Sequence, residues 1–357
     1  MSPLSCPRAR LSVDLDALAH NYRTFATLAD AARTGAAVKA DCYGLGLDHT
    51  LDRLWREGCQ DYFVATLAEA AAVRQRLPDA TVHLLGGLLP GDVPALRGLG
   101  VQPVLNAPEQ VAQWRHDAGA GAPCDLMLDT GMNRLGLRPD QLAGLDLDGL
   151  TLDLALSHLA CADEPDNPMS EVQRDAFARL ARDLPVARRS LANSAGIARG
   201  TGFAFDLVRP GIGLYGGVVH PALADRLRPV AHVEAQVLQL KTIGTGDTVG
   251  YGATWRATRP SRIATIAIGY ADGYLRGFSN RGAMVVAGTR CPVVGRVSMD
   301  LVTLDVTDAP ACATGDWVSV LGGGISLDEA SQWSGLTHYE LLTTLGHRYD
   351  RRYLGQQ

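Results

Sequence analysis

Short apolar runs alternate with amphipathic, alanine-rich stretches from about residue 36 to residue 213. The apolar runs predict buried strands at 62–65, 82–85, 125–128 and 152–156. Helical periodicity lies between them at 67–77, 107–118 and 169–183. This alternation predicts parallel β/α units, and closure into an eight-stranded (β/α)8 barrel of the TIM type fits the residue count. A doubly wound α/β sheet is the alternative, which is weakened because no Gly-x-Gly-x-x-Gly follows the first strand.

The pattern changes after about residue 227. Strand-like runs separated by Gly, Asp and Pro turns follow at 230–240, 262–268, 282–287, 293–306 and 317–321, with helices expected from 326 and at 339–345. We therefore predict an amino-terminal tail over 1–9, a β/α barrel domain over 10–228 and a mainly β domain over 229–357. A strand near 11–15 could pair with either domain.

Composition narrows the class of protein. A chain of 357 residues favours two domains, and 46% hydrophobic with 20% charged residues is ordinary for a soluble enzyme. The net charge of −5 is spread along the chain, which argues against nucleic acid or an anionic membrane as partner. Seven scattered cysteines without a CxxC predict reduced thiols in the cytoplasm and no metal site. We expect no signal peptide and no membrane span, because no apolar run is long enough.

The first candidate for chemistry is Lys39, at the end of the apolar run 35–38 and before Tyr43 and two glycines. A lysine carried into an apolar interior loses its proton more readily, and a neutral amine can form a Schiff base with a carbonyl. The glycines let the backbone turn beside a bound group, and the Tyr43 hydroxyl is a nearby donor. The alternative is a lysine at a strand end whose ammonium reaches solvent.

Two other predicted strands end in a basic side chain. The segment 129–136, Asp-Thr-Gly-Met-Asn-Arg-Leu-Gly, follows one strand and carries Arg134, and His158 follows another. At the carboxyl end of barrel strands both would face the site, where a guanidinium suits a carboxylate or phenolate. A surface arginine in a turn and a hydrogen-bonded core histidine are the alternatives.

A split anion site is the third candidate. Ser194 offers a hydroxyl, and the glycine-bracketed backbone at Gly211 and Ile212 can present N–H groups to a phosphate. Arg209 ends its own strand and could form a salt bridge, contact the phosphate or face a cofactor ring nitrogen. A glycine-rich loop alone is a weak signal.

Taken together, these motifs resemble the alanine racemases, pyridoxal-phosphate enzymes with a β/α barrel and a C-terminal β domain. Six separated motifs occur in the family's order, from residues 13–18 to the last helix. The resemblance implies that Lys39 forms the Schiff base with the cofactor and that Arg209 faces the pyridine nitrogen. It implies that Arg134 contacts the cofactor phenolate and the substrate carboxylate, with His158 also in the cofactor site. The phosphate would be held by Tyr43, Ser194, Gly211 and Ile212.

The same resemblance assigns roles in the β domain. Tyr251, in Val-Gly-Tyr-Gly, would be the second catalytic group, and Met299 would bind the substrate carboxylate through its backbone. Tyr270 and Arg276 would lie at the substrate entrance. In the family these residues come from the partner subunit, so a head-to-tail homodimer with shared active sites is implied.

Racemisation explains why two such groups are needed. One group removes the α-proton from one face and the other returns a proton to the opposite face, and amine and phenol are both weak acids of similar strength. Lys39 would serve D-alanine and Tyr251 L-alanine. Cationic neighbours, His158 and Arg209, would favour the Tyr251 phenolate.

Three positions differ from the family pattern. Met127 stands where a carbamylated lysine is common, so we expect a chloride or another carboxylate to neutralise Arg134. Ser190 replaces a histidine that bonds the ring-facing arginine. His347 occupies a position that can be a phosphate-binding tyrosine, and its role is open.

Other functions remain as alternatives. A racemase of broader specificity, which also accepts serine, is one alternative. Its substrate differs from alanine by one small group, and a pocket discriminates such a group by only about 1–3 kcal/mol of binding free energy. A barrel-type amino-acid decarboxylase would call for acidic and cysteine motifs in the β domain. A non-enzymatic cofactor-binding protein needs only a barrel, so the β domain speaks against it. The sequence leaves a biosynthetic or catabolic role open.

Overall fold

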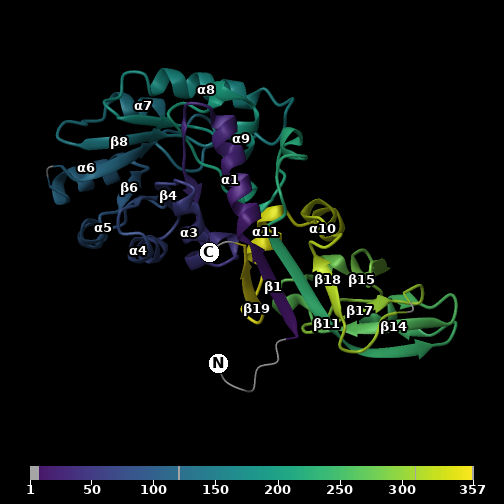
Figure 1. Cartoon of the computed structure of the whole chain (residues 1–357). Coiled ribbons are helices and arrows are strands. Elements are labelled where there is room, and N and C mark those ends of the chain that lie inside the picture. Colours follow the sequence, from purple (N-terminus) through teal and green to yellow (C-terminus); the bar gives the residue numbers. More distant parts are fainter. Residues whose placement is uncertain (1–7, 120, 310, 356–357) are drawn as a thin grey trace.

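The computed structural model describes residues 8–119, 121–309 and 311–355, which form two lobes (Figure 1). Residues 1–7, with Cys6 and most of the predicted tail, lie outside the described residues. One lobe holds parallel strands with helices around them, and the other is built mainly from antiparallel strands. No helix among the described residues is long and apolar enough to cross a membrane.

The first lobe is a closed parallel barrel. Its strands are β2 (Arg33–Thr34), β3 (Ala36–Ala37), β4 (Asp61–Val64), β5 (Thr81–Leu84), β6 (Gln102–Leu105), β7 (Pro123–Met127), β8 (Thr151–Leu156), β9 (Arg188–Ser190) and β10 (Leu207–Val208). β3 to β9 pair in sequence order, and β10 pairs with β2. A parallel bridge between Asn193 and Arg209 joins the two groups. Because only Gly35 separates β2 from β3, the two act as one strand, and the ring has the predicted eight.

Gly35 interrupts that strand for a steric reason. A Cβ there would lie 2.8 Å from the carbonyl oxygen of Asp61 on the neighbouring strand β4. Its N–H donates to Val208 O at 2.9 Å, which ties the first strand to the last. A glycine at this position therefore allows the close backbone approach that closes the barrel.

Helices follow the strands as the periodicity predicted. They are α1 (Leu15–Ala29), α2 (Lys39–Tyr43), α3 (Leu47–Arg56), α4 (Leu67–Arg76), α5 (Val93–Leu99), α6 (Pro108–Asp117), α7 (Pro139–Ala143), α8 (Met169–Leu180) and α9 (Ser194–Ala198). α4 begins with a capping box, in which the Thr66 hydroxyl and the Glu69 carboxylate satisfy each other's backbone N–H groups. Short 3-10 turns η1 (Thr201–Phe203), η2 (Ile212–Tyr215) and η3 (Pro221–Leu223) lead out of the barrel.

The second lobe is a twisted, mainly antiparallel sheet. Its strands are β1 (Ala9–Asp14), β11 (Ala231–Ile243), β14 (Ser261–Ile266), β15 (Ala283–Val286), β16 (Thr289–Pro292), β17 (Val302–Asp305), β18 (Trp317–Leu321) and β19 (Asp350–Leu354). A hairpin of β12 (Thr248–Val249) and β13 (Trp255–Arg256) lies apart. α10 (Leu327–Ser334) and α11 (His338–Thr343) complete the lobe, with short turns η4 (Tyr251–Ala253), η5 (Tyr270–Asp272) and η6 (Arg276–Phe278).

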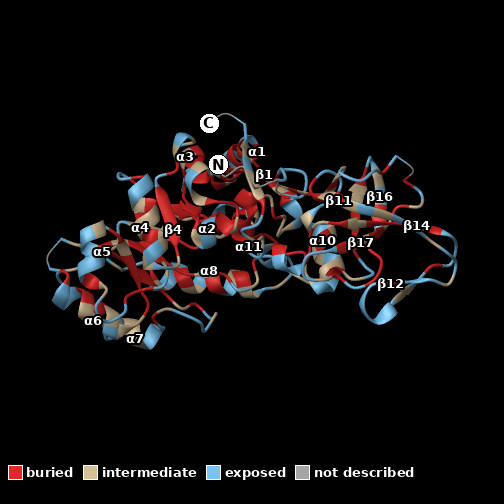
Figure 2. Cartoon of the chain, turned by 90° about the horizontal axis from the view of Figure 1, so that it is seen from below, coloured by how far each residue is buried: buried red, intermediate tan, exposed pale blue. Residues whose placement is uncertain are grey.

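The chain's first strand lies in this second sheet. β1 pairs antiparallel with β11 and parallel with β19, so the first and last strands of the chain lie side by side (Figure 1). β11 is the central strand, since it also pairs with β14 and β18. Buried residues run through both lobes in Figure 2 and join in one large core cluster. Between the lobes, α11 is in contact with α2, the helix that begins at Lys39.

One predicted strand is divided. The run 293–306 was expected to be continuous, but only β17 at its end is a regular strand. Gly295 has φ of 82°, and Ser298 N donates to Leu301 O at 3.0 Å to make a turn. This turn exposes Met299, whose relative accessibility is 53%. The apolar composition predicted a continuous strand, but a glycine with positive φ permits a turn within it.

Candidate functional site

A cavity of about 520 Å³ opens at the carboxyl ends of the barrel strands. Its lining includes all eight residues that the sequence proposed for the cofactor: Lys39, Tyr43, Arg134, His158, Ser194, Arg209, Gly211 and Ile212. They are brought together from segments up to 173 residues apart in the chain, since Lys39 follows β3 and Ile212 begins η2. The structure therefore places the predicted groups in one site.

Lys39 begins a single left-handed turn. Ala40, Asp41 and Cys42 all have φ of 53° with ψ near 50°, and Tyr43 has φ of 57°. Residues with a Cβ lose about 1–2 kcal/mol each in this conformation. The sequence suggested that the glycines make the turn, but the non-glycine residues before Gly44 make it. The handedness turns Tyr43 back into the cavity, where a Cβ on Gly211 would lie 2.3 Å from its hydroxyl.

The surroundings of Lys39 favour a neutral amine. Burial lowers its pKa first, and the Arg134 guanidinium lowers it further. Glu69 opposes this shift, but its carboxylate also accepts from Ala40 N and Ala65 N. The net direction is downward, which raises the fraction of the nucleophilic form at neutral pH.

Arg209 is held by neutral acceptors. Its Nη1 donates to Ser190 Oγ at 2.5 Å and its Nη2 to Ser157 O at 2.6 Å. Burial lowers the pKa of Arg209 to about 10, and Asp125 opposes this shift. Ser190 in turn donates to Leu207 O. The serine at the family's histidine position therefore reaches the arginine directly.

His158 corrects one expectation. Burial first, and then Arg209, Arg134 and Lys39, lower the pKa of His158 to about 3. Its imidazole is therefore neutral near pH 7, because burial first, and then the positive charge of the neighbouring arginines, penalise a further positive charge. The expectation that His158 and Arg209 are both cationic is therefore wrong for His158.

The predicted anion site is also partly changed. Ser194 Oγ accepts from Gly211 N at 2.9 Å and from Gly213 N at 3.2 Å. Gly211 N–H is therefore already engaged by the serine that was expected to act beside it. No acceptor for Ile212 N–H is found among the described residues, so this donor is available to a ligand.

The β-domain residues lie apart from the cavity. Tyr251, Tyr270, Arg276 and Met299 are absent from its lining, and Tyr251 is 71% exposed. Arg134 forms no ion pair with a carboxylate among the described side chains, so the carboxylate expected in place of the lysine at Met127 is not found in the described part of the chain. Met127 itself lines the cavity.

Two family models match the chain, the alanine racemase N-terminal domain over residues 13–219 and the alanine racemase C-terminal domain over residues 230–353. An alanine racemase of Acidiphilium cryptum (strain JF-5) is 46% identical, with 96% of this chain and 97% of the relative covered. The structure of an alanine racemase from Bartonella henselae with covalently bound pyridoxal phosphate matches with a TM-score of 0.93 and 36% identity, covering 97% and 99%. The biosynthetic enzyme of Pseudomonas aeruginosa matches with a TM-score of 0.91, 37% identity and coverage of 98% and 99%.

The chain belongs to the alanine racemase family. Within this alanine racemase fold, a residue that sequence reasoning used only as a helix start lines the cavity. Tyr339 of α11 packs against Tyr43 with ring centroids 6.1 Å apart. His347, which the sequence placed at a tyrosine position, is exposed and absent from the lining.

A buried ion network lies behind the cavity wall of this racemase-family barrel. His83 Nδ1 is 2.6 Å from Asp125 Oδ2, and Nε2 is 3.2 Å from Asp61 Oδ1. Burial lowers the pKa of His83, but both carboxylates outweigh it and raise it to about 9. His83 stacks on Phe63, which lines the cavity. No local sequence pattern indicates this network, because its members come from different strands.

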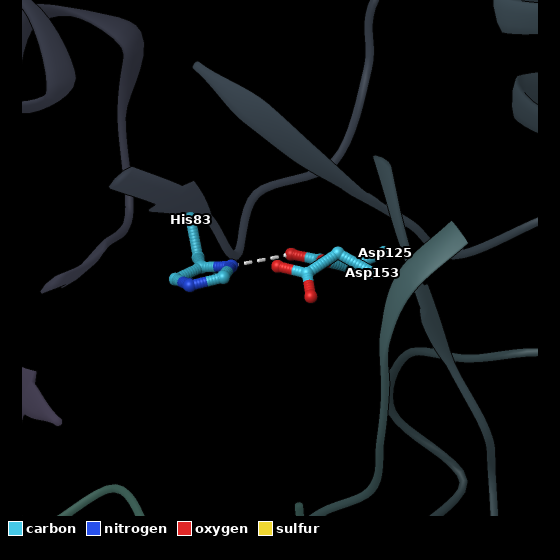
Figure 3. Close-up of side chains that lie close together, drawn as sticks. All are labelled: His83, Asp125 and Asp153. Carbon is cyan, nitrogen blue, oxygen red and sulfur yellow. Dashed lines mark hydrogen bonds and ion pairs between the residues drawn. The ribbon is translucent and has the colours of Figure 1, made fainter. Parts of the chain in front are cut away.

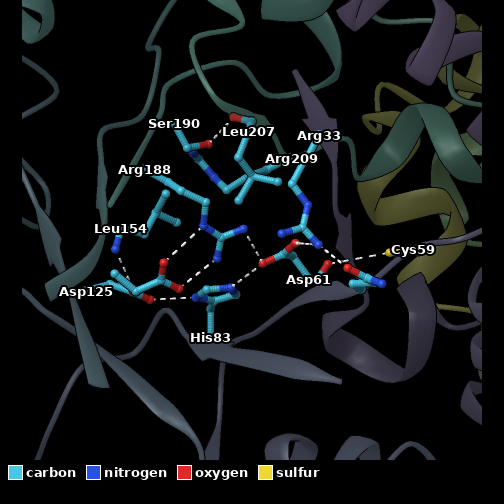
Figure 4. A network of polar contacts seen from close by, with 12 residues as sticks. Arg33, Cys59, Asp61, His83, Asp125, Leu154, Arg188, Ser190, Leu207 and Arg209 are labelled. Atoms are coloured by element: carbon cyan, nitrogen blue, oxygen red, sulfur yellow. Dashed lines mark hydrogen bonds and ion pairs between the residues drawn. The ribbon is translucent and has the colours of Figure 1, made fainter. Parts of the chain in front are cut away.

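The grouping of His83, Asp125 and Asp153 has ligand atoms within 4.8 Å of one another (Figure 3). Arg188, however, pairs with Asp153 at 2.7 Å and, as Figure 4 shows, also with Asp61, at 2.8 Å. Three carboxylates thus face the three cations His83, Arg188 and Arg33. Because the charges already balance, we interpret the group as a structural ion network rather than a metal site.

Proposed function

We propose that this chain is a pyridoxal-phosphate-dependent alanine racemase. The observation that carries the proposal is the gathering of Lys39 with seven other predicted residues in one cavity of a family member. The Bartonella henselae relative carries covalently bound pyridoxal phosphate. Pyridoxal phosphate supplies an electron sink that acidifies the α-hydrogen of a bound amino acid.

The residues of the cavity fit that cofactor. Lys39 presents an amine whose pKa is lowered, as a covalent attachment point requires. The free Ile212 N–H and the hydroxyls of Tyr43 and Ser194 would hold the phosphate. Arg209, with its proton retained, would face the ring nitrogen and keep it unprotonated. Arg134 would meet the phenolate oxygen and the substrate carboxylate, with His158 as a neutral neighbour.

The two proton-transfer groups are proposed to come from two subunits. Lys39 would remove or return the α-proton on the D side, and Tyr251 of the partner subunit would do so on the L side. The support is that Tyr251 and Met299 are exposed, at 71% and 53%, and do not line the cavity that holds Lys39 in the single chain. A head-to-tail homodimer would cover them and complete each site, with Tyr270 and Arg276 at its entrance.

A broader racemase that also accepts serine is the second candidate. The cavity lining near Lys39 and Arg134 is mainly apolar, with Leu85, Met127 and Leu135. Such a lining discriminates an added hydroxyl only weakly. Alanine is favoured, because the family models and relatives carry that name.

One experiment tests the proposal. The purified protein is incubated with single L-amino acids in deuterated water, and both enantiomers and their α-deuterium are measured. We expect D-alanine to form with solvent deuterium at the α-carbon, and visible absorbance of the protein to vanish with borohydride. No D-alanine and no exchange would overturn the function, whereas faster turnover of L-serine would favour the second candidate.

A further inference from the structure

We propose that Gln173 is a positioning residue that holds two catalytic loops in register, an inference that rests on the proposed function. Gln173 lies on α8, is completely buried and belongs to none of the motifs that the sequence indicated. Its side chain reaches between the loop after β7, which carries Arg134, and the loop after β8, which carries His158.

Three hydrogen bonds fix the Gln173 side chain. Its Oε1 accepts from Ala160 N at 2.8 Å, and its Nε2 donates to His158 O at 3.0 Å and to Thr130 Oγ1 at 3.2 Å. Ala160 N can only donate and His158 O can only accept, so the amide has one possible orientation. A buried amide with all of its groups satisfied makes a rigid connection.

The connection continues to Arg209. Thr130 Oγ1, which accepts from Gln173, also shares a hydrogen bond of 2.8 Å with Ser157 Oγ, in which either hydroxyl can be the donor. The carbonyl of the same Ser157 accepts from Arg209 Nη2. One amide on α8 is thereby linked to the arginine proposed for the ring nitrogen and to the Asp-Thr-Gly segment.

His158 depends on this link more than its neighbours do. Its ring has no hydrogen-bond partner among the described residues, so its backbone determines where the ring lies. The carbonyl of His158 and the N–H of Ala160 are both held by Gln173. Releasing them would let the loop after β8 and the Arg134 segment shift independently, and displacements near 1 Å are enough to cost about 100-fold in rate.

The test replaces Gln173 by methionine, which has a similar volume and no hydrogen-bonding amide. In Gln173→Met we expect the Kd for pyridoxal phosphate, from titration of visible absorbance, and the KM for alanine to rise about tenfold each. The matched control is Ser170→Ala. Ser170 is on the same helix, is equally buried and has a hydroxyl without a partner, so we expect both constants to stay within twofold of wild type.

A second variant keeps the test decisive if the first folds poorly. Gln173→Glu retains the acceptor for Ala160 N but loses the donors, and a protonated carboxyl regains one of them. As pH falls, the Kd of this variant for pyridoxal phosphate and its KM for alanine should therefore approach the wild-type values. A loss of stability alone would not produce this change. If both variants lower only the melting temperature, with Kd, KM and pH profile unchanged, the inference is wrong while the function stands. A wild-type protein that binds no pyridoxal phosphate would overturn both.

Discussion

Arg209 Nη1 donates to Ser190 Oγ at 2.5 Å, deep inside the barrel where neither residue reaches solvent freely. The serine passes its own hydrogen to Leu207 O. A guanidinium in this position has only neutral acceptors, and burial lowers its pKa to about 10. The pair therefore stabilises the cation at the bottom of the cavity without supplying a counter-charge.

Replacing that serine should weaken the protein. In Ser190→Ala, one buried guanidinium N–H and the Leu207 carbonyl lose a partner, which costs about 1–3 kcal/mol of unfolding free energy. Denaturant unfolding followed by circular dichroism measures the loss. Ser170→Ala removes an equally buried hydroxyl without a partner and is the control. Equal stability of the two variants would show that the bond to Arg209 contributes nothing.

Shared active sites predict recovery of activity on mixing. Lys39→Ala and Tyr251→Phe should each be nearly inactive in at least one direction of racemisation. After the two are unfolded and refolded together, half of the dimers are mixed and one site in each mixed dimer has both groups, so roughly a quarter of wild-type activity should return. Each variant refolded alone is the control. Absence of recovery, with dimers present, would place both groups in one subunit.

The left-handed turn predicts an unusual glycine effect. Ala40 has φ of 53° and ψ of 49°, a conformation in which glycine avoids the Cβ penalty. Ala40→Gly should therefore raise or preserve the unfolding free energy, by up to about 1 kcal/mol. Ala68→Gly, in the regular helix α4, should lower it by about 1 kcal/mol. A loss of stability in Ala40→Gly equal to that in the control would contradict the turn.

The His83 network predicts a loss of stability in alkali. The folded pKa is about 9 against 6.5 in the unfolded chain, so the contribution is complete below pH 6.5 and is lost as pH rises through 9. For one proton, the unfolding free energy changes by at most about 1.4 kcal/mol per pH unit. Unfolding free energies from pH 6 to pH 10 measure it, and His83→Gln should show a flatter profile over the same range. Parallel profiles would assign the slope to other groups.

The local sequence pattern was enough to predict much of the architecture and part of the site. Alternation of apolar runs with amphipathic stretches predicted the barrel, because strand and helix periodicities are properties of neighbouring residues. The residues at the strand ends, such as Arg134 and His158, were predicted to face the site, because carboxyl ends of parallel strands meet at one edge. Lys39 and Arg209 are examples of residues that strand ends alone brought to the site.

Other features depend on contacts between distant segments, which no local pattern encodes. The neutral state of His158 follows from burial beside Arg209, Arg134 and Lys39, and Tyr339 reaches the cavity only because α11 packs at the barrel mouth. The hydrogen bonds of Gln173 and the His83 network join side chains from separate strands and helices. By itself the sequence determined which elements form and where the reactive side chains leave them. Only the tertiary structure decided which charges and hydrogen bonds those side chains meet, because desolvation and pairing depend on three-dimensional neighbours.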